Sequence, residues 1–158
     1  MFIKNIDRLN KLMLYVIGIM LIVMSLTIAF QVFSRFFIGA SLSWSEELAR
    51  YLMAWLVFIG AAIAVRKGEL IGVEAVVSVV PDKVKTAMKT LVSIVIFGFS
   101  IFLIVKGFDM LEVVKNQRSP AMKIPMIWVY SSIPVCGVLM TLNSIAVCIE
   151  LFRKDGDQ

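Results

Sequence analysis

The chain has 158 residues, of which 60% are hydrophobic and 17% are charged, and its formal net charge is +5. A mean hydropathy of +0.93 excludes a soluble globular domain. The sequence contains no histidine, the usual proton shuttle and the commonest metal ligand. We therefore expect no catalytic residue, no cofactor and no metal site. The positive charge matches membrane lipids as partners and requires no nucleic acid.

Four stretches without a formal charge divide the chain, at residues 12–34, 51–65, 90–105 and 124–149. A bilayer core about 30 Å thick needs roughly 20 apolar residues in a helix, and fewer where Lys or Arg side chains reach back to the headgroups. We predict an all-α integral membrane protein. We expect a single domain over residues 1–158 with four spans at approximately 11–34, 46–66, 85–108 and 124–150.

The second span is expected to begin with a polar turn. Ser43 and Glu46 have the spacing of a capping box, in which the two side chains and backbone amides bond reciprocally. Glu46 and Glu47 also suit the positive end of the helix dipole. Arg50 follows within one turn of both acids, so one guanidinium is expected to pair with both carboxylates.

A short amphipathic helix is expected between spans two and three. Residues 70–80 are apolar except for Glu74 and Ser78, which lie four residues apart, and such a segment suits the membrane surface. The next helix is expected to run from about Pro81 to Lys115, roughly 50 Å at 1.5 Å per residue.

The four charge-free stretches hold only uncharged polar residues, notably Ser25, Gln31, Thr141, Asn143 and Ser144. We interpret these residues as interhelical hydrogen-bonding partners rather than as a transport site. The two cysteines, Cys136 and Cys148, lie about 18 Å apart on one predicted helix, so they cannot pair with each other. We expect both to be small buried hydrophobic residues.

Charge distribution predicts the orientation. An even number of spans places both termini on one side of the membrane. Ten of the sixteen Lys and Arg residues lie on that side, counting the connection between spans two and three. The positive-inside rule therefore predicts cytoplasmic termini.

The densest group of candidate functional residues surrounds the start of the second span: Arg35, Trp44, Glu46, Glu47, Arg50, Tyr51 and Trp55. Two interpretations stay open. The group forms either an interfacial aromatic belt with a solvated ion pair or a docking face for a partner subunit.

An ordered set of short segments over residues 31–68 carries a family resemblance: QVFSRF at 31–36, WSEELARY at 44–51, Trp55, FIGAA at 58–62 and VRKG at 65–68. This set resembles the small membrane subunit of TRAP (tripartite ATP-independent periplasmic) transporters, DctQ type. One departure is Leu70, close to where relatives commonly carry a histidine. The second half of the chain matches the family only in hydropathy.

The resemblance implies a heterodimer with a large multi-span transport subunit in a bacterial inner membrane. A periplasmic binding protein would deliver an organic acid, such as a C4-dicarboxylate or sialic acid, and a sodium gradient would drive uptake. The small subunit would be a scaffold without a transport site, so the sequence does not reveal the acid. Two alternatives stay open: a self-sufficient homo-oligomeric carrier, and an assembly subunit of another membrane complex. A membrane enzyme has least support.

Basic residues on the side opposite the termini form a second candidate surface: Lys106, Lys115, Arg118 and Lys123. They would either help to dock an acidic binding protein or anchor the chain to lipid headgroups.

Overall fold

The computed structural model describes residues 2–39, 42–68 and 82–155, and this part of the chain is built from helices. In chain order they are α1 (Phe2–Phe33), the π-helical turn η1 (Ser34–Ile38), α2 (Ser43–Lys67), α4 (Asp82–Val114), α5 (Ile127–Tyr130) and α6 (Ser132–Asp155). Four helical segments are long and apolar enough to cross a membrane. The predicted all-α fold with four spans is confirmed, while the predicted helix at 70–80 lies outside the described residues.

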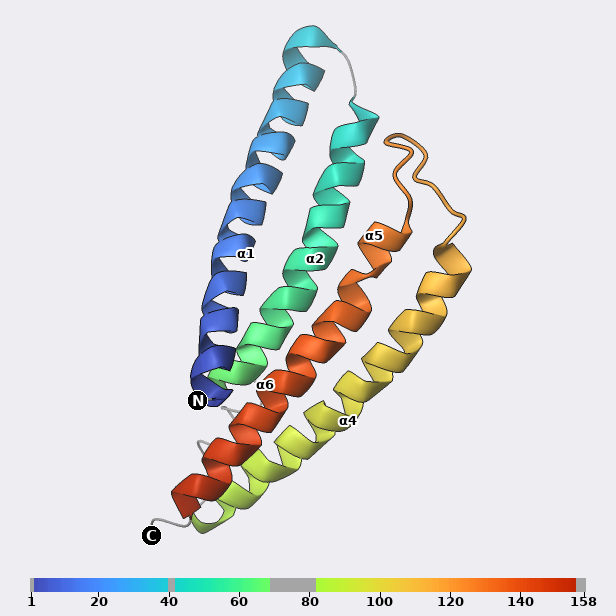
Figure 1. Cartoon of the computed structure of the whole chain (residues 1–158). Helices are drawn as coiled ribbons and strands as arrows, with labels where there is room; N and C mark the ends of the chain where they lie inside the picture. Colours follow the sequence, from blue (N-terminus) through green and yellow to red (C-terminus); the bar gives the residue numbers. More distant parts are fainter. Residues whose placement is uncertain (1, 40–41, 69–81, 156–158) are drawn as a thin grey trace.

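The long helices lie side by side in one layer, in the order α1, α2, α6, α4 (Figure 1). In the part of the chain that the structure describes, the backbone of α4 does not closely approach α1 or α2. The helices therefore do not close into a four-helix bundle. The start of α1 and the end of α6 lie at the same end of the layer, which we call the terminal end. The opposite end, with η1 and residues 115–126, is called the loop end.

Small residues let α4 and α6 approach closely. A Cβ atom added to Gly107 of α4 would lie 2.7 Å from Cδ of Pro134, and one added to Gly137 of α6 would lie 2.7 Å from Cγ1 of Ile104. Both separations are too short for carbon atoms, so only glycine fits at these two positions. Such small-residue contacts are typical of helix pairs in membranes, where close packing replaces the hydrophobic effect.

Polar side chains link the same two helices. The hydroxyls of Ser100 and Thr141 lie 2.8 Å apart, and Ser144 donates a 2.8 Å hydrogen bond to the carbonyl of Ser93. At the opposite edge of the layer, Gln31 of α1 donates a hydrogen bond to the carboxylate of Glu46 on α2. These bonds confirm the interhelical role predicted for Gln31, Thr141 and Ser144.

The centre of the layer is a small apolar core. Ala62, Val65, Cys136 and Met140 are buried and pack together. The thiol of Cys136 is fully buried and donates to the carbonyl of Phe58, whereas Cys148 is half-buried. Both cysteines are free, as predicted. Helix α4 begins and ends within a residue of the predicted limits.

The capping box predicted for α2 is wrong. The helix begins at Ser43, so this residue is already helical and Leu42 occupies the cap position. The hydroxyl of Ser45 instead donates 2.7 Å to the carbonyl of Leu42. The carboxylate of Glu46 turns toward Gln31 of the neighbouring helix, which leaves it unavailable for the reciprocal bond.

Candidate functional site

The predicted interface residues lie at the loop end: Arg35 is in η1, which follows α1, and the others are in the first half of α2, whose start lies beside residues 115–126. Arg35 lies in η1 and is exposed, and Trp44 is 41% exposed. Glu46 and Arg50 are also exposed, whereas Glu47 is buried. Some of the predicted interface residues, which we call the patch, therefore face outward, and others form contacts within the chain.

Glu47 binds the loop that precedes α5. Its two carboxylate oxygens accept hydrogen bonds from the backbone amides of Ala121 (3.0 Å) and Met122 (2.9 Å). Hydrogen bonds to an ionised acceptor are roughly twice as strong as neutral ones, and this carboxylate is only 9% exposed. Glu47 thus holds the 119–123 turn against α2.

The predicted ion pairs of Arg50 with both acids are not formed. Glu47 is bonded to backbone amides and Glu46 to Gln31, although the charge of Arg50 lies near enough to act on Glu47. Within the described ranges, Arg50 makes no hydrogen bond or ion pair of its own.

Two aromatic residues of the predicted patch contact the chain's own fourth span. The hydroxyl of Tyr51 lies 3.6 Å from the sulfur of Met126, and Nε1 of Trp55 donates a 3.2 Å bond to the carbonyl of Trp128. Both side chains therefore join α2 to the α5 segment. Trp44 is the member of the aromatic set that points most clearly outward.

The second predicted surface is only partly free. Lys106 forms a 2.9 Å ion pair with Asp109, and both side chains are exposed. Lys115, Arg118 and Lys123 are exposed in the loop-end connection. Backbone bonds order this connection, including those between Ser119 and Ile124 and between Gln117 and Met126, and Lys123 has a left-handed φ of 55°.

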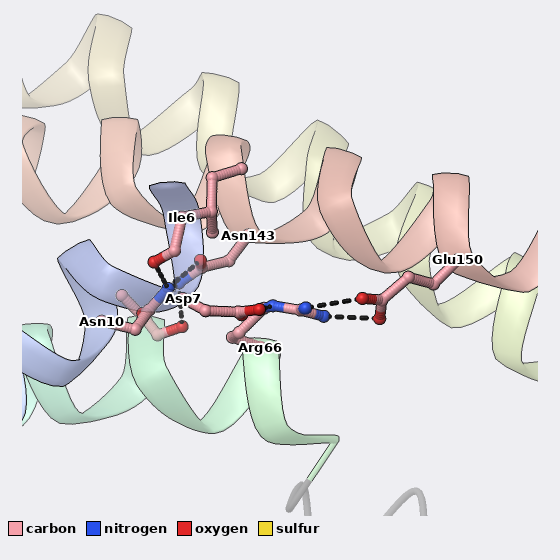
Figure 2. Close-up of polar contacts among 7 residues, drawn as sticks. Ile6, Asp7, Asn10, Arg66, Asn143 and Glu150 are labelled. Atoms are coloured by element: carbon pink, nitrogen blue, oxygen red, sulfur yellow. Dashed lines mark hydrogen bonds and ion pairs between the residues drawn. The ribbon is translucent and has the colours of Figure 1, made fainter. Parts of the chain in front are cut away.

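Sequence reasoning missed a charged cluster at the terminal end (Figure 2). Arg66 donates through Nη1 and Nη2 to both oxygens of Glu150, at 2.6 and 2.7 Å, and through Nε to Asp7 at 2.8 Å. The cluster thereby joins α2, α6 and α1. A signal was present, because Arg66 and Glu150 each end a charge-free stretch on the same side of the membrane.

An amide pair lies beside this cluster (Figure 2). Asn10 and Asn143 donate to each other at 2.7 and 2.9 Å. Asn143 also donates to the carbonyl of Ala62, and Asn10 to the carbonyl of Ile6. Asn143 is almost fully buried, so its predicted interhelical role is confirmed. Among the residues with described positions, no group of three or more acids or cysteines could hold a metal.

Comparison with known proteins gives a consistent result. The family model described as the DctQ component of tripartite ATP-independent periplasmic transporters matches residues 9–154. The sialic acid TRAP transporter permease protein SiaT of Haemophilus influenzae is 26% identical over 137 residues, which cover 87% of this chain but 22% of SiaT. The small permease protein SiaQ of Vibrio cholerae is 23% identical, covering 80% of this chain and 73% of SiaQ. The C4-dicarboxylate small permease protein DctQ of Pseudomonas aeruginosa is 28% identical over 72 residues, covering 46% of this chain and 34% of that protein.

Proposed function

This chain belongs to the DctQ-component family of tripartite ATP-independent periplasmic transporters, and from that premise we propose that it braces a large transport subunit without a transport site of its own. It is a small membrane subunit of a transporter rather than an enzyme. Its four apolar helical segments and its family make it a multi-pass membrane protein.

The observation that carries the proposal is that polar side chains inside the layer form hydrogen bonds to neighbouring helices. The side chains of Ser100, Thr141, Asn143 and Ser144 all form hydrogen bonds between helices. Carriers mark a substrate path with intramembrane charges or unwound helices. These four polar side chains of the layer are instead used to hold its helices together.

The open arrangement of the helices favours the presence of a protein partner. Helix α1 contacts mainly α2, and many of its large apolar side chains are exposed, among them Ile19, Leu26 and Phe30. In the SiaT relative, the matching segment is part of a much longer permease chain. The proposed contacts with the large subunit are the outward-facing Arg35, Trp44, Glu46 and Arg50, and Glu47, Tyr51 and Trp55 would support this surface from within.

The rest of the assembly follows from the family and the relatives' names. The proposed cargo is an organic acid of the sialic acid or C4-dicarboxylate type, delivered by a periplasmic binding protein and taken up with sodium. The proposed location is a bacterial inner membrane with cytoplasmic termini, because most Lys and Arg residues lie on that side. Lys115, Arg118 and Lys123, with a smaller part for the paired Lys106, would then face the binding protein.

Co-purification tests the subunit role. The tagged chain should retain a much larger multi-span membrane protein at a 1:1 ratio in mild detergent. Cysteines placed at Trp44 or Arg35, in a background without the native cysteines, should cross-link to that protein. A chain that purifies only as a homo-oligomer, with cross-links only to itself, would contradict the proposal.

A further inference from the structure

A half-open hollow of about 390 Å³ lies at the loop end between α2 and the α5–α6 segment. Its polar side is formed by Glu47 and Arg50, and its apolar wall includes Ala54, Phe58 and Ile133. The volume falls within the range of small-molecule sites, which are concave and mostly apolar with few polar groups. A ligand of this hollow would need a charged end beside the polar side and an apolar body along the wall.

Depth in the membrane narrows the answer. Arg50 and Arg66 bound the charge-free stretch of α2, and sixteen residues at 1.5 Å each separate them by about 24 Å. This is close to the thickness of a hydrocarbon core of about 30 Å. Arg50 therefore lies at the boundary between the headgroups and the acyl chains, while Ala54 and Phe58 follow one and two turns deeper.

Arg50 offers hydrogen-bond donors to an anion, although its charge also acts on the carboxylate of Glu47. The carboxylate of Glu47 is already bonded to the amides of Ala121 and Met122. The exposed guanidinium of Arg50 has no hydrogen bond or ion pair in the described part of the chain, so its donors are available. Arg118 and Lys123 of the nearby loop are exposed and add positive potential. A guanidinium binds phosphate oxygens through two parallel hydrogen bonds.

We propose that this hollow binds one anionic phospholipid, with its phosphate on Arg50 and an acyl chain along Ala54, Phe58 and Ile133. The lipid supplies both parts that the hollow requires: a phosphate at headgroup depth and an apolar chain directed toward the membrane centre. A free phosphate would leave the apolar wall uncovered. All residues of the site belong to this chain, so lipid binding can be tested without the large subunit. In the complex, the phosphate on Arg50 would then lie at the proposed contact with that subunit.

The test uses the full chain, purified in a mild detergent and titrated with palmitoyl-oleoyl phosphatidylglycerol. Native mass spectrometry measures the fraction of protein that retains one lipid. Arg50→Gln should weaken this binding by about tenfold or more, because it removes a charge-assisted bidentate contact. Ala54→Phe should also weaken it by filling the wall of the hollow. Lys11→Gln removes an exposed cation at the other boundary and should leave binding unchanged.

Three outcomes would overturn the proposal. If Arg50→Gln retains as much lipid as the wild type, Arg50 does not bind the phosphate. An equal loss in Lys11→Gln would show unspecific headgroup attraction. Displacement of the lipid by millimolar inorganic phosphate would show a simple anion site. Arg50→Gln alters no packed apolar group, so it decides the question even if Ala54→Phe fails to fold.

Discussion

Asn10 and Asn143 are 133 residues apart in the sequence, and they hold each other through two reciprocal hydrogen bonds of 2.7 and 2.9 Å. The pair is the main polar link between α1 and α6, two helices that otherwise touch little. Because Asn143 also donates to the carbonyl of Ala62, one buried amide connects α1, α2 and α6.

Replacing this amide should loosen the attachment of α1. We expect Asn143→Ala to lower the free energy of unfolding by about 1–2 kcal/mol, since interhelical hydrogen bonds in membranes are individually modest and Asn10 would lose its partner. Denaturant titration in detergent micelles measures this change. Ser25→Ala, at an exposed position of α1, should have no measurable effect. A double-mutant cycle with Asn10→Ala should show coupling, and strict additivity would contradict the paired geometry.

The charged cluster at the terminal end should contribute less to the free energy of unfolding than its short distances suggest. Asp7 and Glu150 are about half exposed, so solvent screens both pairs, although the bidentate geometry favours Glu150. Arg66→Gln is expected to cost about 1 kcal/mol, and the loss should shrink at high salt. Arg8→Gln, at a nearby position that is exposed, serves as the control. A loss that is independent of salt would show that packing of the arginine stem dominates.

Glycine substitutions should separate α4 from α6. We expect Gly107→Ala to destabilise the protein by about 1–3 kcal/mol, because the added methyl would lie 2.7 Å from Pro134 and the helices must move apart. Gly98→Ala lies on the same helix with no atom within 4 Å of the new methyl, so it should be neutral or slightly stabilising. Thermal unfolding compares the two variants. Equal stability would rule out the close approach.

The Glu47 carboxylate should hold the loop-end connection. Glu47→Ala leaves the amides of Ala121 and Met122 without their acceptor and should loosen this turn. A cysteine at position 121 should then react faster with a thiol reagent, and yield of the complex with the large subunit should fall with it. Glu112→Gln and Lys4→Ala, both exposed, should change neither. Unchanged loop reactivity would show that other contacts hold this turn.

The sequence predicted where the helices lie in the chain better than it predicted which helices pack against each other. Length and apolarity indicate that a segment can cross a membrane, so the four spans were predictable. The limits of α4 were predictable because Pro81 precedes its first turn and Pro120 follows its end. The order of the layer was not, because membrane helices are apolar on most sides and periodicity does not show which face meets which helix. The small residues Gly107 and Gly137 mark close contacts only once their opposite residues are known.

The hydrogen-bonding role of uncharged polar residues within a span was predictable, as with Thr141 and Asn143, although the sequence did not show their partners. The bonds of Glu47 were not, because its partners are backbone amides, which have no sequence signature. The local i,i+3 spacing favoured Arg50 instead. The loop competes successfully because two amides satisfy both carboxylate oxygens at once, whereas an exposed arginine side chain loses rotamer freedom on pairing.

Sodium-driven uptake into proteoliposomes tests the central claim most directly. The account predicts that this chain alone takes up no sialic acid or C4-dicarboxylate above protein-free vesicles, and that uptake begins when the large subunit is reconstituted with it and the binding protein is supplied. Uptake by this chain alone would contradict the account and restore the self-sufficient carrier.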